Sequence, residues 1–276
     1  MISKNLATQS SSIIRVKNET SERTNDRLAI EAPLEISLSI PQENPPILQK
    51  NISITMRTPG DDKDLALGFL FTEGIIVSPS QVDQVFVSEN SVTVILNTSM
   101  AIDLSKIERH FYTSSSCGVC GKSSIGAIKT VCRLPSSEQD FCVSGSIIGS
   151  LPAQIRKQQA VFDHTGGLHA AALFDPLGNY IVLREDVGRH NALDKLIGSM
   201  FQKDILPLHR HILVLSGRAS FELIQKAAMA GIKCVMAVGA PSSLAVELAE
   251  EFDMTLIGFL KSSSYNIYCG EKRIDL

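Results

Sequence analysis

The chain has 276 residues, of which 44% are hydrophobic and 20% charged, and its 26 basic and 29 acidic side chains leave a formal net charge of -3. This composition excludes a disordered protein, which would be less apolar, and one that grips nucleic acid along its length, which would be basic. No apolar run approaches the length of a membrane span, and the first residues show no secretory signal. We therefore expect a cytoplasmic protein with no nucleic-acid and no membrane partner.

Residues 1–110 are predicted to form a small α+β region with a flexible tail. The first 25 or so residues are rich in Ser, Thr and Asn, and we expect them to lie loose. Period-two alternation and helix-boundary residues define the rest of the region. The predicted elements are a strand or bent strand pair over 27–40, a strand over 52–56, a helix over 61–74 and two strands within 82–96.

Residues 111–143 are predicted to form a loop and linker that carries most of the cysteines. The stretch around Cys117-Gly118-Val119-Cys120 is rich in Ser and Gly and has no hydrophobic period. Four of the six cysteines of the chain lie between Cys117 and Cys142. In a reducing location such cysteines are more often reactive or metal-binding than bridged.

Three chemical uses of the Cys117–Cys120 pair remain open at this point. Zinc needs four ligands, which Cys132 and Cys142 would complete, although their spacing lacks a second short knuckle. A thioredoxin-type motif normally begins a helix after a strand, and no strand closely precedes the pair. Sulfur carriage needs an exposed thiol of low pKa on a segment that can visit two partners, and Lys122 would favour the thiolate.

Residues 144–276 are predicted to alternate between strands and helices, which implies a sheet with helices on both faces. The predicted helices cover 146–159, 189–202, 219–230 and 242–252, and the predicted strands cover 169–174, 180–183, 211–215, 234–238 and 254–260. Several strand-to-helix junctions carry groups suited to phosphate, among them Arg218 and Lys261. Because ligands of α/β sheets bind at the carboxyl ends of strands, these junctions favour a phosphorylated ligand. His169, after a Gly pair, is as well explained by a buried structural role as by a ligand contact.

Four motifs together resemble the FdhD family of formate dehydrogenase accessory proteins over residues 27 to the end. They are Ser116-Cys117-Gly118-Val119-Cys120-Gly121, Thr165-Gly166-Gly167-Leu168-His169-Ala170-Ala171, Glu185-Asp186-Val187-Gly188-Arg189-His190-Asn191-Ala192-Leu193-Asp194-Lys195 and Ser216-Gly217-Arg218-Ala219-Ser220. The resemblance implies a sulfurtransferase that takes persulfide sulfur from a cysteine desulfurase. It would pass that sulfur to the molybdenum cofactor, bis(molybdopterin guanine dinucleotide), for formate dehydrogenase.

The resemblance also places the site residues. Cys117 corresponds to the persulfide cysteine, and Cys120 is its partner. The nucleotide-cofactor segment falls on Phe259, Leu260, Lys261, Ser262, Ser263 and Ser264, and Arg218 is expected to hold phosphate. The last three serines replace the Pro or Gly and the arginine that the family usually carries there. The molybdenum cofactor would be bound as a substrate in transit, and no intrinsic metal is expected.

The family's C-terminal domain is similar to cytidine deaminases, so the resemblance implies a three-layer α/β/α domain. Zinc deaminases need H-x-E and P-C-x-x-C motifs. The similar positions here hold His169-Ala170-Ala171 and Pro241-Ser242-Ser243-Leu244-Ala245. With the glutamate and both cysteines replaced, the site cannot activate a zinc-bound water. We therefore expect a nucleotide-shaped pocket without deaminase chemistry.

Two alternatives and one assembly hypothesis accompany this interpretation. The protein would instead be a zinc-stabilised module if the four loop cysteines hold metal. It would be a non-catalytic chaperone if it only escorts apo-formate dehydrogenase. A homodimer is hypothesised from the apolar composition and from the two dinucleotide arms of the cofactor.

Overall fold

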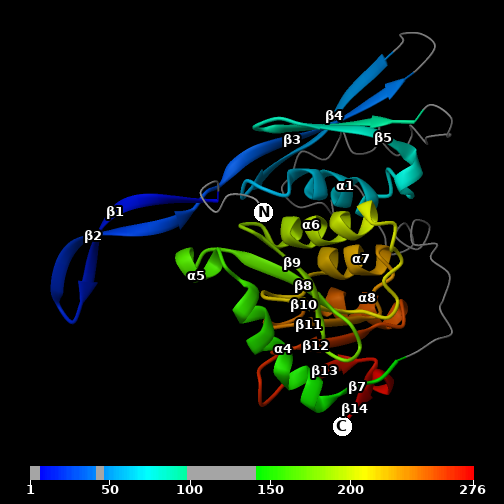
Figure 1. The fold of residues 1–276 in the computed structure, drawn as a ribbon. Helices are drawn as coiled ribbons and strands as arrows, with labels where there is room; N and C mark the ends of the chain where they lie inside the picture. Colours follow the sequence, from blue (N-terminus) through cyan, green and yellow to red (C-terminus); the bar gives the residue numbers. More distant parts are fainter. Residues whose placement is uncertain (1–6, 42–46, 98–140) are drawn as a thin grey trace.

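A computed structural model describes residues 7–41, 47–97 and 141–276 (Figure 1). Cys117, Cys120 and Cys132 lie outside the described residues, so the predictions that rest on them are not tested by the fold. Within these ranges the chain forms a four-stranded sheet, a six-stranded sheet and two two-stranded pairs, with helices between and around the two larger sheets.

The N-terminal residues form a long antiparallel hairpin, β1 (Thr8–Lys17) and β2 (Thr20–Ala29), which projects away from the body (Figure 1). The expectation that the first 25 residues lie loose is therefore wrong for residues 8–25. Asn18 and Glu19 have φ values of 47° and 65°, which suit a two-residue hairpin turn. Most side chains on both faces are solvent-exposed, so the sequence shows no apolar alternation that would have indicated strands.

The four-stranded sheet confirms the elements that were predicted before residue 97. Its order is β4-β3-β6-β5, and a helix covers its buried face. The helix ends before Gly74, whose φ of 72° allows the chain to turn sharply. The elements are β3 (Ala32–Pro41), β4 (Ile47–Arg57), α1 (Asp62–Thr72), the 3-10 turn η1 (Pro79–Gln81), β5 (Val82–Val87) and β6 (Ser91–Leu96).

The six-stranded sheet has the order β13-β12-β11-β10-β8-β9, in which β10, β11 and β12 run parallel. Its elements are α4 (Gly145–Gln158), α5 (Phe162–Thr165), β8 (His169–Phe174), β9 (Tyr180–Asp186), α6 (Arg189–Gln202), β10 (Ile212–Leu215), α7 (Phe221–Met229), β11 (Cys234–Ala237), α8 (Ser243–Glu251), β12 (Thr255–Gly258) and β13 (Asn266–Cys269). A short pair, β7 (Val143–Ser144) and β14 (Ile274–Asp275), flanks the 3-10 turn η2 (Glu271–Arg273).

Helices lie on both faces of this sheet, as the alternation of strands and helices predicted. Leu213 and Leu215 of β10 pack in one cluster with α6, α7 and α8, whereas Ile212 and Val214 pack in a second cluster with α4. The protein is therefore a mixed α/β protein. The expected likeness to cytidine deaminases stays a prediction.

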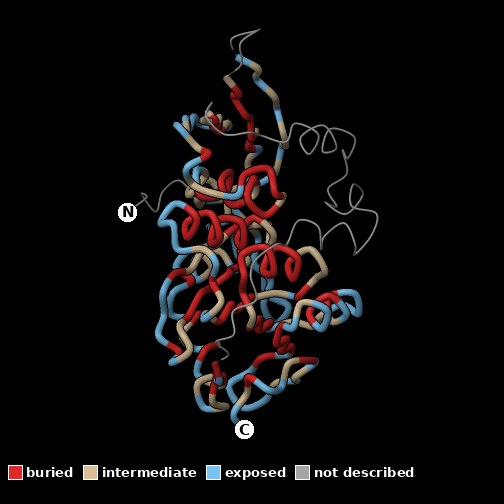
Figure 2. Tube along the Cα trace, turned by 90° about the vertical axis from the view of Figure 1, so that its right-hand side faces the viewer, coloured by how far each residue is buried: buried red, intermediate tan, exposed pale blue. Residues whose placement is uncertain are grey.

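The two regions share one hydrophobic core, which runs through the middle of the molecule (Figure 2). Helices α1 and α6 cross closely because Gly68 and Gly198 face the partner backbone at the crossing. Whether residues 1–110 and 144–276 fold as separate units stays a prediction. No helix within the described ranges is long and apolar enough to cross a membrane.

Candidate functional site

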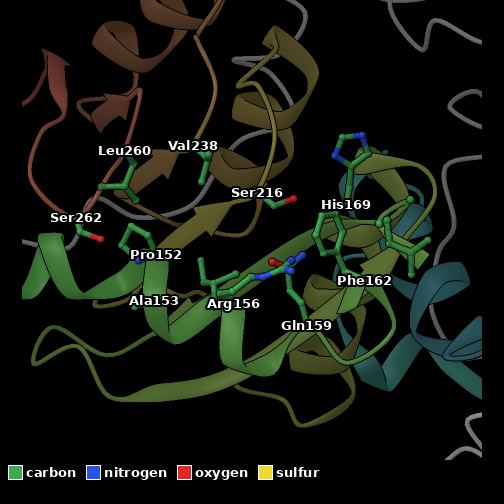
Figure 3. A pocket seen from close by; sticks show the side chains of 14 residues that line it. Pro152, Ala153, Arg156, Gln159, Phe162, His169, Ser216, Val238, Leu260 and Ser262 are labelled. Carbon is green, nitrogen blue, oxygen red and sulfur yellow. The ribbon is translucent and has the colours of Figure 1, made fainter. Parts of the chain in front are cut away.

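A cavity of about 670 Å³ opens between α4 and the carboxyl ends of the parallel strands. Figure 3 shows side chains of α4 on one side of it and residues that follow β10, β11 and β12 on the other. This is the edge at which open α/β sheets place their ligands. Its lining includes Arg156, Gln159, Phe162, His169, Ser216, Leu260 and Ser262.

The predicted cofactor segment, residues 259–264, lies at this cavity. Phe259 adopts a φ of 52°, which turns the chain out of β12, and its N–H donates to Gly239 O at 3.1 Å. Leu260 is fully buried beneath the cavity, whereas Lys261, Ser262, Ser263 and Ser264 are exposed. The turn therefore anchors one apolar residue and leaves the ammonium and three hydroxyls accessible.

A cluster of basic side chains surrounds His169 at one end of the cavity. Burial lowers the pKa of His169, and the nearby charges of Arg189, His190 and Arg218 lower it further. Nε of Arg189 is buried and has no hydrogen-bond partner within the described ranges. Gly217 lies against the His169 ring and brings the Arg218 loop close to it. The cluster is therefore electropositive and suited to an anion.

Two helices begin at this cluster without a side-chain cap. Gly188 precedes α6 and Ser220 precedes α7, and neither supplies a capping hydrogen bond from its side chain. The N-terminus of a helix carries partial positive charge and unpaired N–H groups. Asp186 accepts a hydrogen bond from the N–H of Gly188, and Glu222 lies in the first turn of α7, so these carboxylates offset part of that charge. The positive potential at the cluster therefore comes mainly from Arg189 and Arg218.

The remaining wall of the cavity is held in place by Glu185. Its carboxylate accepts hydrogen bonds from the N–H groups of Val161 and Phe162, at 3.1 and 3.0 Å. Arg156 stacks over the Phe162 ring at 4.6 Å from the centroid. Sequence reasoning missed Arg156 and Phe162, because α5 has only four residues and shows no periodic pattern. The only sequence feature that pointed to this wall was Glu185 in the charged turn, whose carboxylate binds the start of α5.

Comparisons with known proteins show which family the chain belongs to. The family model described as the FdhD/NarQ family matches residues 30–275. The chain belongs to the FdhD/NarQ family. This confirms the resemblance that the four motifs indicated.

Curated FdhD/NarQ relatives cover nearly the whole chain. A protein named sulfur carrier protein FdhD from Streptomyces coelicolor is 44% identical over 280 residues, which cover 98% of this chain and 96% of the relative. A protein of the same name from Saccharolobus solfataricus is 40% identical over 263 residues, which cover 95% and 96%. A crystal structure assigned as a formate dehydrogenase accessory protein from Desulfotalea psychrophila matches with a TM-score of 0.74 and 22% identity. It covers 98% of this chain and 100% of that one, and it establishes the fold alone.

The strongest FdhD motif, residues 185–195, is mostly structural. Asp186 is fully buried and holds Lys195 at 2.7 Å. Asn191 bonds to Met56 O at 2.8 Å, and Lys195 bonds to Thr58 O at 2.8 Å, so the motif fastens the C-terminal region to β4. The sequence suggested that the whole charged turn between β9 and α6 binds an anion. Within that turn, only Arg189 and His190 belong to the basic cluster.

The cysteines of this FdhD/NarQ chain are described only in part. Cys142 is exposed, and its thiol lies 3.7 Å from Lys272 O. Cys234 and Cys269 are buried, and burial raises the pKa of the Cys234 thiol to about 12, so that thiol is unreactive. Within residues 7–41, 47–97 and 141–276, no three His, Cys, Asp or Glu side chains gather as metal ligands. The zinc alternative involves Cys117, Cys120 and Cys132 and stays untested.

Proposed function

We propose that this protein is a sulfur carrier that receives sulfur from a cysteine desulfurase. It transfers that sulfur to bis(molybdopterin guanine dinucleotide), and the sulfurated cofactor then activates formate dehydrogenase. Named sulfur carriers that are 40–44% identical over nearly the whole chain support the carrier role. The proposal keeps the expected cytoplasmic location, in which thiols stay reduced.

The loading step uses Cys117, with Cys120 as its neighbour on the predicted loop. The Cys117 thiolate attacks the outer sulfur of a persulfide on the desulfurase, and the S–S bond of that persulfide breaks. The desulfurase leaves as a thiolate, and Cys117 becomes the persulfide. No external oxidant or reductant is needed, because the sulfur moves between two thiols.

The proposal that the molybdenum cofactor is the second partner rests on the cavity beside the basic cluster. The cofactor is a substrate here, and its phosphates require positive charge. Arg218, Lys261 and the uncapped start of α7 supply that charge at the carboxyl edge of the sheet. A cavity of about 670 Å³ is in the size range of sites for nucleotide-sized ligands. The possible second copy of the chain stays a hypothesis.

Mass spectrometry of the full chain after incubation with a cysteine desulfurase and cysteine tests the carrier role. We expect one added sulfur atom on the peptide that contains Cys117, removed by a reductant and absent from Cys117→Ala. The same variant should fail to activate formate dehydrogenase in cells, whereas Cys142→Ala should activate it normally. Full activation by Cys117→Ala would overturn the proposal and favour a chaperone that only escorts the apo-enzyme.

The site should bind a polyphosphate more tightly as the pH falls. Burial, and after it the nearby cations, hold the pKa of His169 below the usual 6.5, and a bound anion would offset those cations and raise that pKa. Binding then takes up a proton, so affinity rises as the pH falls from about 8 to about 6, by at most about tenfold per pH unit. Calorimetry with guanosine diphosphate measures this dependence.

Two histidine variants separate this linkage from a general effect of pH. His169→Ala should lose the pH dependence. His209→Ala should keep it, because His209 precedes β10 at the edge opposite the cavity and bonds to Gly231 O. An unchanged pH profile in His169→Ala would show that another group takes up the proton.

A further inference from the structure

One wall of the cavity beside α4 is formed by the stacked side chains of Arg156 and Phe162. The Arg156 guanidinium lies 4.6 Å from the centroid of the Phe162 ring, and Figure 3 shows both side chains toward the end of the cavity at which His169 lies. Arg156 also pairs with Asp163 at 3.1 Å, which offsets its charge. Two stacked planar groups with little net charge suit a flat ring better than a phosphate.

Helix α5, which carries Phe162, adds nothing to the hydrophobic core. It has four residues, none of them buried, and Val161 at its start supplies no cap from its own side chain. A single helical turn does not persist by itself in water. Of its four residues only Phe162 lines the cavity. The position of α5 therefore matters to the cavity far more than to the stability of the fold.

Glu185 of β9 fixes the start of this short helix. One carboxylate oxygen accepts from the N–H of Val161 at 3.1 Å, and the other accepts from the N–H of Phe162 at 3.0 Å. The second of these bonds holds the backbone of Phe162 itself. A carboxylate from a distant strand thus orders a surface turn whose one contact with the cavity is an aromatic ring.

We propose that the Arg156–Phe162 pair is the surface on which the purine base of the nucleotide arm stacks, and that Glu185 is the positioning residue that holds Phe162 in place for this contact. This inference rests on the proposed function and divides the cavity between the two ends of the ligand. The base lies against α4 and α5, and the phosphates lie on the sheet side with Arg218 and Lys261.

Calorimetry of the full chain with guanosine diphosphate and with inorganic pyrophosphate tests the contact with the base. A stacked base adds affinity that pyrophosphate lacks, so we expect guanosine diphosphate to bind about fivefold or more tightly. Phe162→Ala should remove most of this difference and leave the affinity for pyrophosphate unchanged, whereas Phe162→Trp should keep the difference. The matched control, Phe86→Ala at an exposed position of β5, should bind both ligands like the wild type.

Glu185→Gln tests the positioning role with little change of shape. An amide has one acceptor oxygen, and its NH2 group would face the second N–H donor. We expect guanosine diphosphate to bind about threefold or more weakly, which corresponds to one lost hydrogen bond. Pyrophosphate affinity and the urea midpoint should not change, because α5 buries no residue. The matched control, Glu247→Gln at an exposed position of α8, should behave like the wild type in all three measurements.

The double variant Glu185→Gln with Phe162→Ala separates positioning from a general structural effect. If Glu185 acts through Phe162, the double variant should bind guanosine diphosphate no more weakly than Phe162→Ala alone. Additive losses, or equal losses of both ligands in either single variant, would overturn the inference. Equal affinity of the wild type for the two ligands would overturn it too and leave the phosphate site standing. Binding of neither ligand would refute the site for the cofactor as well, whereas sulfur loading of Cys117 is measured separately.

Discussion

Replacing Asp186 with alanine is expected to destabilise the protein by about 3–5 kcal/mol, because it leaves the Lys195 ammonium buried without its counter-ion. Both side chains are at most 2% exposed, and their charged atoms lie 2.7 Å apart. Asp186 also accepts hydrogen bonds from the N–H groups of Thr58 and Gly188, at 3.1 and 2.8 Å. Its loss therefore weakens the attachment of β4 to α6 as well as the ion pair. Urea unfolding at neutral pH measures the change.

Two comparisons give this prediction its controls. Asp163→Ala removes the partner of Arg156 in a pair whose side chains are 48% and 56% exposed, and it should cost no more than about 1 kcal/mol. The double variant Asp186→Ala with Lys195→Met should recover much of the lost stability, because no unpaired charge is then buried. If Asp186→Ala alone were as stable as Asp163→Ala, the buried pair of Asp186 and Lys195 would not hold the two regions together.

Replacing Gly198 with valine is expected to destabilise the protein by at least about 3 kcal/mol, because the new side chain would overlap the backbone of α1. A Cβ atom at Gly198 would collide with Asp64 O, and one at Gly68 would collide with Asp194 O. Backbone atoms in two packed helices cannot move aside as a side chain can. The variant should unfold at much lower urea concentration or accumulate as insoluble protein.

The matched control for this prediction is Glu247→Val on α8. Glu247 is exposed, so valine there changes only the helix propensity, by well under about 1 kcal/mol. If Gly198→Val unfolded at the same urea concentration as Glu247→Val, the prediction would be contradicted. Separating α1 from α6 would then cost little free energy. In that case the shared core of the two regions would not depend on the close crossing.

The sequence predicted the elements that have one buried face, and it failed where that signal was absent. Helix α6 was predicted with its bounds correct, because its apolar side chains recur with helical spacing after Gly188. The β1–β2 hairpin was missed because neither of its faces is buried against a core. Strand β13 was also missed, since it is a four-residue edge strand with little buried surface.

The candidate site divides in the same way. The sequence predicted the junctions that carry Arg218 and Lys261, because strand-to-helix turns have a local sequence signature. Arg156 and Phe162 were not, because their place at the cavity depends on the contact of Glu185 with the start of α5. Arg184 belongs to the same charged turn as Glu185, but it pairs with Asp64 of α1 at 2.8 Å and takes no part in the cavity.

The sequence by itself determined the family, the alternating α/β order and the segment after β12 at the ligand edge of the sheet, because each of these follows from residues close together in the chain. Only the tertiary structure decided which charges of residues 185–195 are structural and which belong to the basic cluster around His169. It also decided that Glu185 holds the start of α5 at the cavity. Such roles depend on burial and on partners far away in the chain, and a local pattern of residues carries neither.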